Sequence, residues 1–447
     1  MHHQQREQEE KDLILPIAGY SPMHNAIQQT VDHFFRHESG RMIAVLSKLL
    51  GLQHLQTAQD LTQDTLLQAL HTWRIKGLPE NPKAWLYRVA KNKAVDFLRR
   101  EKTYRRVESA QAHLLNSTLA LHATITQLFE DDEIGDSQLR MIFACCHPAI
   151  PVESQLALAL KTLCGLSVSE IANAFLKDNE TIAKRIYRAK DKIRTEKIEL
   201  DLPSTAQLPK RLDAVLHCLY LLFNEGYHSS HPEQLIREDL CEEAMRLAYL
   251  LTQMPLTNGP RTNALLALFC FQASRIKARQ DEGGNIILLK NQDRSKWYRP
   301  LIQKGFFFLE AATKKETSVY HLEAAIAYLH AVAPSFEETD WKAIYYLYQL
   351  LAAAHPNPFI HLNKAIAASY AVSKESALQE LKAIVGLENY YLYHTAIGEV
   401  YFELAQMSVA RIYYQKALTL TKSLAEQHLL QEKITACGDD FPAFSPS

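Results

Sequence analysis

The sequence predicts an all-α fold. Apolar residues recur at the i, i+3 and i+4 spacing of a helix face, first in a run from Val31 to Leu50. The 447 residues include only 14 Gly and 17 Pro to interrupt such runs, and 47% are hydrophobic. A chain of this length has room for two to four domains, each with its own core.

The compartment can also be predicted. No apolar run approaches the roughly 18 to 20 residues that span a bilayer, and the opening MHHQQREQEEKDL lacks the apolar core of a signal peptide. The seven Cys are an odd number scattered through helical patterns, which argues against a disulfide framework. We therefore expect a cytoplasmic protein with free thiols and no membrane partner.

Charge is distributed unevenly along the chain. The net charge is −1, which argues against a nonspecific nucleic-acid coat. Lys83–Arg106 nevertheless holds nine Lys or Arg against two acids, and Lys177–Lys197 holds eight against four. Two basic segments in a neutral protein predict two separate phosphate-contacting surfaces.

Breaks in the helical patterns divide the chain. Residues 1–24 are polar, and we expect them to be disordered. A helix pair or bundle should follow, then a helix over Leu61–Trp73, the break GLPENP at 77–82 and a helix over Lys83–Arg100. In the Leu61–Trp73 helix, the residues expected to face inward are Leu61, Leu66, Ala69, Leu70 and Trp73. Beyond 210 the pattern is helical, except at 281–290, where DEGGN followed by IILL favours a turn and a short strand.

The first basic segment, NPKAWLYRVAKNKAVDFLRRE at 81–101, is an amphipathic helix pattern. Its apolar stripe consists of Ala84, Trp85, Val89, Val95 and Leu98, and its cationic face of Arg88, Lys91, Lys93, Arg99 and Arg100. Such a helix can hold DNA phosphates while aromatic rings stack on exposed bases. The alternative is a solvated surface helix.

The second basic segment has a helix-turn-helix pattern. Ser167 should cap a first helix, 177–179 should turn, and 180–194 should form the second helix. Outward positions on the second helix are Thr181, Lys184, Arg185, Arg188 and Lys192, and inward positions are Ile182, Ile186, Ala189 and Ile193. This arrangement suits a major groove, although an ordinary helical hairpin has the same pattern.

Several motifs resemble the extracytoplasmic-function group of RNA polymerase sigma factors, in the subgroup with a long carboxy-terminal extension containing tetratricopeptide-like repeats. The motifs are QDLTQDTLLQALHTW, NPKAWLYRVAKNKAVDFLRRE, LRMIFACCHPAI and GLSVSEIANAFL with TIAKRIYRAKDKIR, followed in the extension by YLLFNEGY, LCEEAMRLA, NQDRSKW and TDW. The resemblance implies region 2 over 25–105, a linker over 106–132, region 4 over 133–200, a helical extension domain over 205–335 and tetratricopeptide-like repeats over 336–447.

The resemblance also implies roles for residues. Region 2 would dock on the clamp coiled coil of the largest polymerase subunit, and the polymerase flap would be a further contact. Candidate polymerase contacts are Asp60, Gln63, Asp64 and Leu67. The minus-10 element would be read by Asn81, Trp85, Arg88, Lys91, Asn92, Arg99 and Arg100, and the minus-35 element by Thr181, Lys184, Arg185, Arg188 and Lys192.

The extension contains one well-formed tetratricopeptide-like pattern. Its positions are Ile397, Gly398, Tyr401, Ala410, Tyr414 and Ala417, with Lys422 where such repeats usually carry proline. A weaker pattern contains Ala365, Tyr370, Ala377 and Leu381. Because one unit cannot bury its own face, 318–375 should supply stacking helices. The repeats would either bind a peptide in a groove, near Asn363, Tyr390, Tyr391 and Tyr393, or only pack on the rest of the chain.

Two other polar groupings have competing interpretations. Cys145, Cys146 and His147 look like part of a metal site, but three adjacent residues do not easily close a tetrahedron, so we expect no metal and no cofactor. Polar residues of the extension predict either a structural ion-pair and hydrogen-bond network or a regulatory pocket for a protein or small ligand. They are Glu225, Tyr227, His228, Asp293, Arg294 and Trp297.

The favoured function is a promoter-specificity sigma factor with core RNA polymerase and promoter DNA as partners. One alternative is a protein-interaction scaffold with a vestigial DNA-binding part. Another is a helical enzyme using Glu225, His228 or Asp293, but the sequence lacks nucleophile-base spacing and a Gly-rich phosphate loop. We therefore expect no catalytic residues.

Overall fold

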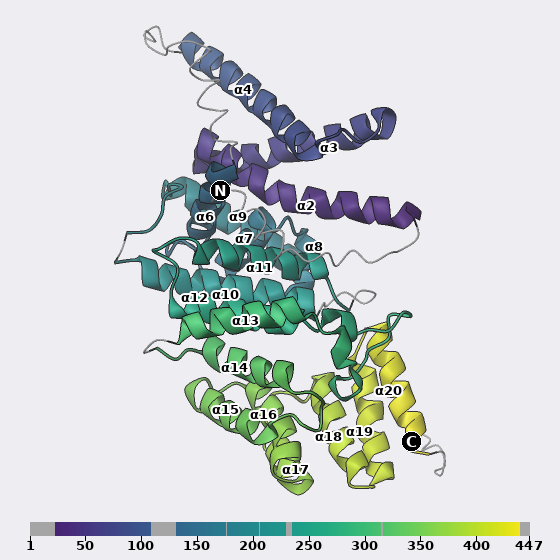
Figure 1. Ribbon diagram of the computed structural model, residues 1–447. Coiled ribbons are helices and arrows are strands. Elements are labelled where there is room, and N and C mark those ends of the chain that lie inside the picture. The colour runs from purple at the N-terminus through teal and green to yellow at the C-terminus, as the bar shows by residue number, and fades with distance from the viewer. Residues whose placement is uncertain are drawn as a thin grey trace. The chain divides into compact units, whose positions relative to one another are not determined.

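The computed structural model describes residues 23–108, 131–175, 177–204, 206–228, 235–313 and 316–438 (Figure 1). The expected tail over 1–22 and most of the expected linker, 109–130, lie outside these ranges. The described chain is helical, with an isolated antiparallel bridge between Gln280 and Ile286 in place of the short strand expected there. The predicted all-α fold is confirmed.

The chain divides into two compact units. Unit 1 comprises the chain up to Leu222 together with Glu242–Leu251, and unit 2 comprises Phe223–Cys241 and the chain from Thr252 onward. Helices α10 (Leu208–Tyr227) and α11 (Glu238–Thr252) each contribute residues to both units. The other elements of unit 1 are α2 (Met23–Leu50), η1 (Leu52–His54), α3 (Leu55–Lys76), α4 (Pro82–Glu108), α6 (Asp131–Cys145), α7 (Val152–Leu163), α8 (Val168–Ala174) and α9 (Asn179–Thr195).

Helix α2 is the centre of unit 1 and contacts α3, α4, α6 and α7. The helix pair or bundle expected over this segment is a single helix, because no proline interrupts Met23–Leu50 and the helix continues through Gly40. One core cluster joins Phe35, Met42 and Val45 of α2 to Trp73 of α3 and Leu86 of α4. Within it the buried Glu38 carboxylate accepts a 2.6 Å hydrogen bond from the Tyr87 hydroxyl, so the buried charge has a partner.

The α2–α7 contact is close because of Gly40. A Cβ atom at this position would lie 1.9 Å from the backbone oxygen of Leu163 in α7, so only glycine allows this approach. A second link is electrostatic, since Lys48 of α2 and Arg140 of α6 lie 2.9 and 2.8 Å from the Asp136 carboxylate. Burial opposes ionisation of Asp136, but these hydrogen bonds and charges prevail and lower its pKa.

Helix α3 ends and α4 begins as the break at 77–82 predicts. Gly77 has a φ of 80° and donates its N–H to the Trp73 carbonyl at 2.9 Å. The Asn81 side-chain oxygen accepts the Ala84 N–H at 2.9 Å, and α4 starts at Pro82. The helix continues to Glu108, beyond the expected end at Arg100.

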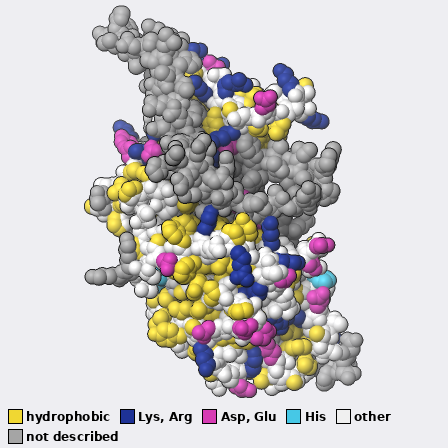
Figure 2. All heavy atoms as spheres, in the orientation of Figure 1, with side chains coloured by type: hydrophobic (Ala, Val, Ile, Leu, Met, Phe, Trp, Pro, Cys, Tyr) yellow, Lys and Arg dark blue, Asp and Glu magenta, His cyan; other side chains and the backbone are white. Residues whose placement is uncertain are grey.

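Unit 2 is a series of helical hairpins. Its remaining elements are α12 (Pro260–Ala273), η2 (Ile276–Ala278), η3 (Leu289–Asn291), η4 (Arg294–Lys296), α13 (Arg299–Ala312), α14 (Val319–Val332), α15 (Trp341–Ala354), α16 (Pro358–Ala371), α17 (Lys374–Lys382), α18 (Tyr391–Glu403), α19 (Met407–Leu420) and α20 (Leu424–Ala436). Successive helices from α14 to α20 contact one another. Over α13–α15, hydrophobic side chains gather on the face in Figure 2. Large exposed apolar residues of these helices are Phe306, Phe307 and Tyr346.

The hairpin α18–α19 carries the predicted tetratricopeptide-like unit. Ile397, Gly398, Tyr401, Ala410, Tyr414 and Ala417 are all buried in one core cluster. A Cβ at Gly398 would lie 2.7 Å from the Tyr414 ring, so the small residue permits close helix packing. In the weaker unit Ala365, Ala377 and Leu381 are buried, whereas Tyr370 is 37% exposed. The assignment to that repeat family remains a prediction.

We predict that Gly40→Ala lowers the free energy of unfolding of the full chain by roughly 1–3 kcal/mol, because α2 and α7 must separate to accommodate the methyl group. Urea unfolding followed by circular dichroism measures this change.

The matched control is Gly135→Ala, also in a helix, where the nearest atom to the new Cβ would be 3.6 Å away. Its free energy of unfolding should stay constant or rise by up to about 1 kcal/mol, because alanine favours helix. Equal destabilisation by both substitutions would contradict the close-approach explanation.

Candidate functional site

Helix α4 is fixed to unit 1 by aromatic packing. The Trp85 ring meets Trp73 of α3 edge-on, with centroids 5.5 Å apart, and Trp73 in turn contacts Phe35 of α2 at 5.4 Å. Trp85 is half-buried, so part of its ring remains accessible for stacking. Asn81, the other candidate at this end, is exposed, and its side-chain oxygen caps α4.

The inward face of α4 differs partly from the predicted stripe. Ala84 was expected inward but is exposed, and the fully buried positions are Leu86, Tyr87, Ala90, Ala94 and Val95. The reason is that α4 packs against α2 and α3 together, and this wider contact also buries Tyr87, whose hydroxyl reaches Glu38. Leu70 of α3 was likewise expected inward but is 42% exposed.

The candidate minus-10 cations form an open row along α4. Arg88, Asn92, Arg99 and Arg100 are exposed and Lys91 is half-buried. Arg99 lies 3.7 Å from Asp96, an exposed pair of little energetic weight. The exposed guanidinium groups of Arg88 and Arg100 are therefore placed to contact phosphates.

Helices α8 (Val168–Ala174) and α9 (Asn179–Thr195) lie where the two helices of a helix-turn-helix were expected, and they contact one another. The Ser167 hydroxyl accepts the Glu170 N–H and the Glu170 carboxylate accepts the Ser167 N–H, which makes a capping box at the start of α8. The Asp178 carboxylate accepts both the N–H and the hydroxyl of Thr181 at the start of α9, and these bonds lower its pKa. The four predicted inward residues, Ile182, Ile186, Ala189 and Ile193, are buried.

Most candidate minus-35 residues lie on the outer face of α9. Lys184, Arg188 and Lys192 are exposed, with Lys184 pairing with Glu180 at 2.6 Å. Arg185 differs, because its side chain is only 16% exposed and pairs with Glu153 at the start of α7. Thr181 is half-buried and engaged with Asp178. The open cationic surface of α9 is therefore narrower than predicted.

The candidate polymerase contacts occupy one exposed part of α3. Asp60, Gln63 and Asp64 are exposed, and Leu67 is 56% exposed. Apolar side chains continue this surface toward the end of the helix, at Leu70, Ile75 and Leu78. The start of α3 also contacts α9, since the Lys190 ammonium donates to Gln56 at 2.8 Å and to Gln59.

The Cys145–Cys146–His147 segment is used for packing. Both thiols are buried, and burial raises the pKa of Cys145 to about 12 and that of Cys146 above its usual range. The His147 ring accepts the Ala149 N–H at 3.2 Å, within the turn after α6. Among the described residues, no group of three or more His, Cys, Asp or Glu is placed to hold a metal ion.

The candidate regulatory residues of the extension do not all take part in one ion-pair network. Tyr227 and His228 surround Arg279, which lies 3.9 Å from the Tyr227 ring centroid. Arg294 stacks on Trp297 at 4.1 Å. Asp293 is exposed and caps η4 by accepting the Ser295 N–H at 2.9 Å, and Glu225 is half-buried. The Asp293 carboxylate is engaged in this local turn, and among the described residues it forms no ion pair with these cations.

The sequence interpretation missed Arg275, Arg279 and His330 in this part of the molecule. Arg275 and Arg279 follow α12 in the segment SRIKARQ, which has ordinary composition and no motif. The spacing of four between the two arginines was the available signal, since it places them near one another in a helical turn.

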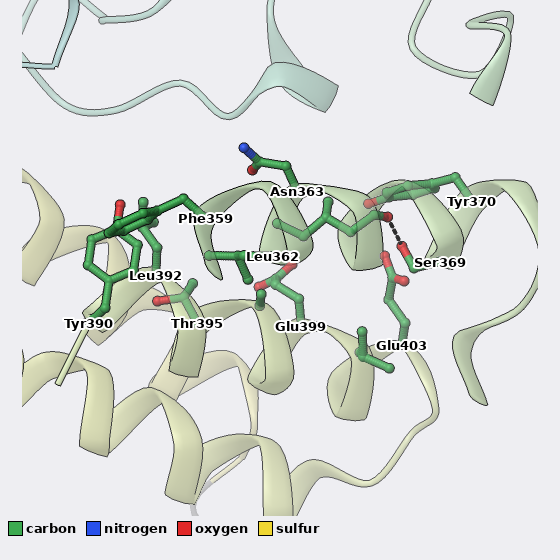
Figure 3. A pocket seen from close by; sticks show the side chains of 13 residues that line it. Phe359, Leu362, Asn363, Ser369, Tyr370, Tyr390, Leu392, Thr395, Glu399 and Glu403 are labelled. Atoms are coloured by element: carbon green, nitrogen blue, oxygen red, sulfur yellow. Dashed lines mark hydrogen bonds between the residues drawn. The ribbon is translucent and has the colours of Figure 1, made fainter. Parts of the chain in front are cut away.

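A pocket lies between α16 and α18 (Figure 3). Phe359 and Tyr390 lie at one end with ring centroids 5.1 Å apart, and Tyr370 and Glu403 lie at the other. Asn363 and Tyr390 line it as predicted for a groove. Tyr391 and Tyr393 do not, because Tyr391 donates to Glu426 and Tyr393 packs edge-on against His394.

Comparison with known proteins connects these features to families. Residues 34–104 match the family model Sigma-70 region 2, and residues 211–313 match a family of unknown function, DUF6596. An uncharacterized protein of Rhizobium meliloti is 33% identical over 412 residues, which cover 90% of this chain and 97% of that protein. The RNA polymerase sigma factor SigV of Bacillus subtilis is 26% identical over 146 residues, 32% of this chain and 78% of SigV. No solved structure gives a significant match.

Residues 34–104, which run from α2 through α3 into α4, are thus similar to sigma-70 region 2, and this match supports a protein of the sigma-70 class. Over nearly its whole length, the chain belongs to the same family as the Rhizobium protein. Among the described residues, no helix is both long and apolar enough to cross a membrane.

We predict that the folded protein exposes one reactive thiol. Six Cys are buried, and Cys437 is half-buried with a raised pKa, caused mainly by burial. Titration with a thiol-specific disulfide reagent should therefore detect one slowly reacting thiol per chain in the native protein and seven thiols per chain in denaturant.

Cys437→Ser should leave no reactive equivalent in buffer. Rapid reaction of two or more thiols in the native protein would contradict the predicted burial of Cys145 and Cys146.

Proposed function

We propose that this protein is a promoter-specificity sigma factor of the extracytoplasmic-function group. It binds core RNA polymerase in the cytoplasm, recognises minus-35 and minus-10 elements and supports promoter opening. The observation that carries the proposal is the region 2 match over 34–104, in a unit that also contains a second cationic helix on a helix-turn-helix. The sigma-factor name of the Bacillus relative supports the same role.

The minus-10 element is assigned to α4. Its exposed cations Arg88, Arg99 and Arg100 are suited to the phosphates of a single strand, and the accessible part of Trp85 to a base. Each stacked base is worth about 1–3 kcal/mol, so unpaired bases held on α4 would offset part of the cost of opening. The step uses binding free energy and needs no nucleophile.

The minus-35 element is assigned to α9 in duplex form. Lys184, Arg188 and Lys192 are exposed on one face, while Ile182 and Ile186 fix the opposite face to the unit 1 core. Arg185 acts differently from the sequence-based prediction, because its pairing with Glu153 makes it a positioning residue for α9.

Polymerase docking is assigned to the exposed surface of α3. Asp60, Gln63 and Asp64 supply polar and anionic groups, and Leu67 supplies an apolar side chain with more than half of its surface in solvent. An exposed apolar residue beside charged ones is typical of a protein interface.

The extension is assigned a regulatory or interaction role through the α16–α18 pocket. Aromatic side chains at both ends would hold apolar groups, and Glu399 and Glu403 favour a cation. Burial, and then the charges of Glu403 and Glu399, raise the pKa of Tyr370 to about 12. Both carboxylates already have ammonium partners, Glu403 in Lys374 and Glu399 in Lys433 and Lys290, so a bound cation would share or displace these pairs. A basic peptide segment fits this chemistry better than an acidic one.

Run-off transcription with purified core polymerase tests the sigma-factor role. The full chain should direct a specific transcript, and Leu67→Ser should reduce it by about tenfold or more by weakening docking. Leu424→Ser is the matched control, because Leu424 is 64% exposed on α20.

Absence of any specific transcript with the full chain would contradict the proposal and favour the scaffold alternative. Equal losses from the two leucine substitutions would contradict the assignment of the docking surface. Truncation near residue 203 is a poorer test, because it removes Leu208–Leu222 and Glu242–Leu251 from unit 1.

Arg188→Gln should weaken binding of the polymerase complex to a minus-35 duplex and reduce the slope of log K against log salt by about 1, because one phosphate contact is lost. Arg188 is exposed and forms no ion pair within the described ranges, so folding should be unaffected. Fluorescence anisotropy over a salt series measures both quantities.

Lys422→Gln removes an equally exposed cation from the extension and should change neither value. If both substitutions changed the slope equally, general charge rather than α9 would account for binding.

A further inference from the structure

Three arginines of unit 2 lie close together around two aromatic rings. Arg275 and Arg294 contact the Trp297 ring, with their guanidinium carbons 5.5 and 4.1 Å from its centroid. Arg279 lies over Tyr227 and also reaches the His228 ring nitrogen at 3.2 Å. Arg275 and Arg279 flank the short helix η2, which contacts η4 where Arg294 lies, so the three guanidinium groups form one cationic cluster. After burial, the charge of Arg275 also lowers the pKa of both Arg279 and Arg294.

This Arg cluster has no carboxylate partner within the described ranges of the chain. None of its members forms an ion pair there, and Glu337 influences Arg294 only through its charge at longer range. Arg279 is only 7% exposed. Buried arginines are normally paired with acids, so three neighbouring guanidinium groups without one carry a substantial cost.

The cluster also has unused hydrogen-bond donors. Trp297 is 3% exposed, and its indole N–H makes no hydrogen bond. Arg275 Nε and Arg294 Nη2 are likewise buried without an acceptor. Buried donors are rarely left unpaired, and here they come from a Trp and two Arg around the same ring.

Neighbouring histidines do not supply a compensating charge. Burial, and then the charges of Arg275 and Arg294, lower the pKa of His330 to about 3. Desolvation, and then the charges of Arg279 and Arg275, lower the pKa of His228 to about 3 as well. Both imidazoles are therefore neutral at physiological pH. Arg275, Arg294 and His330 are half-buried and His228 is exposed, so solvent reaches parts of these side chains.

We propose that Arg275, Arg279, Arg294 and Trp297 form a binding site for a small oxyanion, with a phosphate group as the best match. A phosphate would accept hydrogen bonds from the free guanidinium and indole donors and neutralise the charge that no acid of the described chain balances. This site is separate from the α16–α18 pocket and does not depend on the sigma-factor role.

Isothermal titration of the full chain with inorganic phosphate, at ionic strength held constant with chloride, tests the site. We expect saturable one-to-one binding and a raised Tm. Glycerol phosphate is the second ligand and acetate the third. Binding of phosphate but not of the ester would assign free phosphate, and binding of both would assign a phosphorylated small molecule. Acetate should bind at least about tenfold more weakly, because it offers fewer acceptor oxygens.

Arg294→Gln should weaken phosphate binding by about tenfold or more, and Lys296→Gln, which removes an exposed charge two residues away, by less than about twofold. Trp297→Phe keeps the ring but removes the indole N–H, so a loss of about three- to tenfold is expected even if Arg294→Gln fails to fold.

Circular dichroism establishes folding of each variant. The proposal is overturned if none of the three anions binds the folded wild-type chain. It is also overturned if acetate binds as well as phosphate, or if folded Arg294→Gln and Lys296→Gln lose affinity equally. Because none of these measurements involves polymerase or DNA, their failure leaves the proposed promoter role unaffected.

Discussion

The close approach of α2 to α7 at Gly40 is the constraint on which the rest of unit 1 depends. A side chain at this position would occupy the space of the Leu163 carbonyl, so the two helices are packed at backbone contact. Helix α2 also supports α3 and α4 through the Phe35, Trp73 and Trp85 rings, while α7 supports α9. The cationic faces of α4 and α9 are thus supported through one continuous set of packed helices.

Much of this arrangement could be predicted from the sequence where apolar residues follow helical spacing and where Gly or Pro marks the end of a helix. The inward residues of α9 follow from strict helical spacing, and Gly77 and Pro82 mark the α3–α4 junction because their backbone requirements are local. Leu70 and Ala84 were assigned inward wrongly, because apolar character alone does not say how wide a helix contact is. The width of the buried helix face depends on neighbours that are distant in sequence, such as Glu38, which accepts a hydrogen bond from the Tyr87 hydroxyl.

The candidate site residues likewise include some whose exposure could be predicted from the sequence and some whose partners could not. Exposure of Arg88, Arg188 and Leu67 follows from helix periodicity, but the pairing of Arg185 with Glu153 joins residues of two helices and has no local signature. Asp293 and Arg294 are adjacent in the sequence, but the fold gives them different partners. The Asp293 carboxylate accepts the Ser295 N–H within a turn, and the Arg294 guanidinium stacks on the Trp297 ring. Arg275 acquires its surroundings only through the fold, which brings η2 against η4.

The shared helices α10 and α11 have a consequence for how this protein can change over time. The Arg246 guanidinium of α11 binds Glu243 and the Gln138 side chain of α6, and Arg211 of α10 donates to the backbone oxygen of Phe143. A stop codon just after α9 would therefore leave buried polar groups of α6 without their partners. Selection that keeps the first unit stable also opposes loss of the downstream coding sequence, so the two halves of the gene are expected to be inherited together.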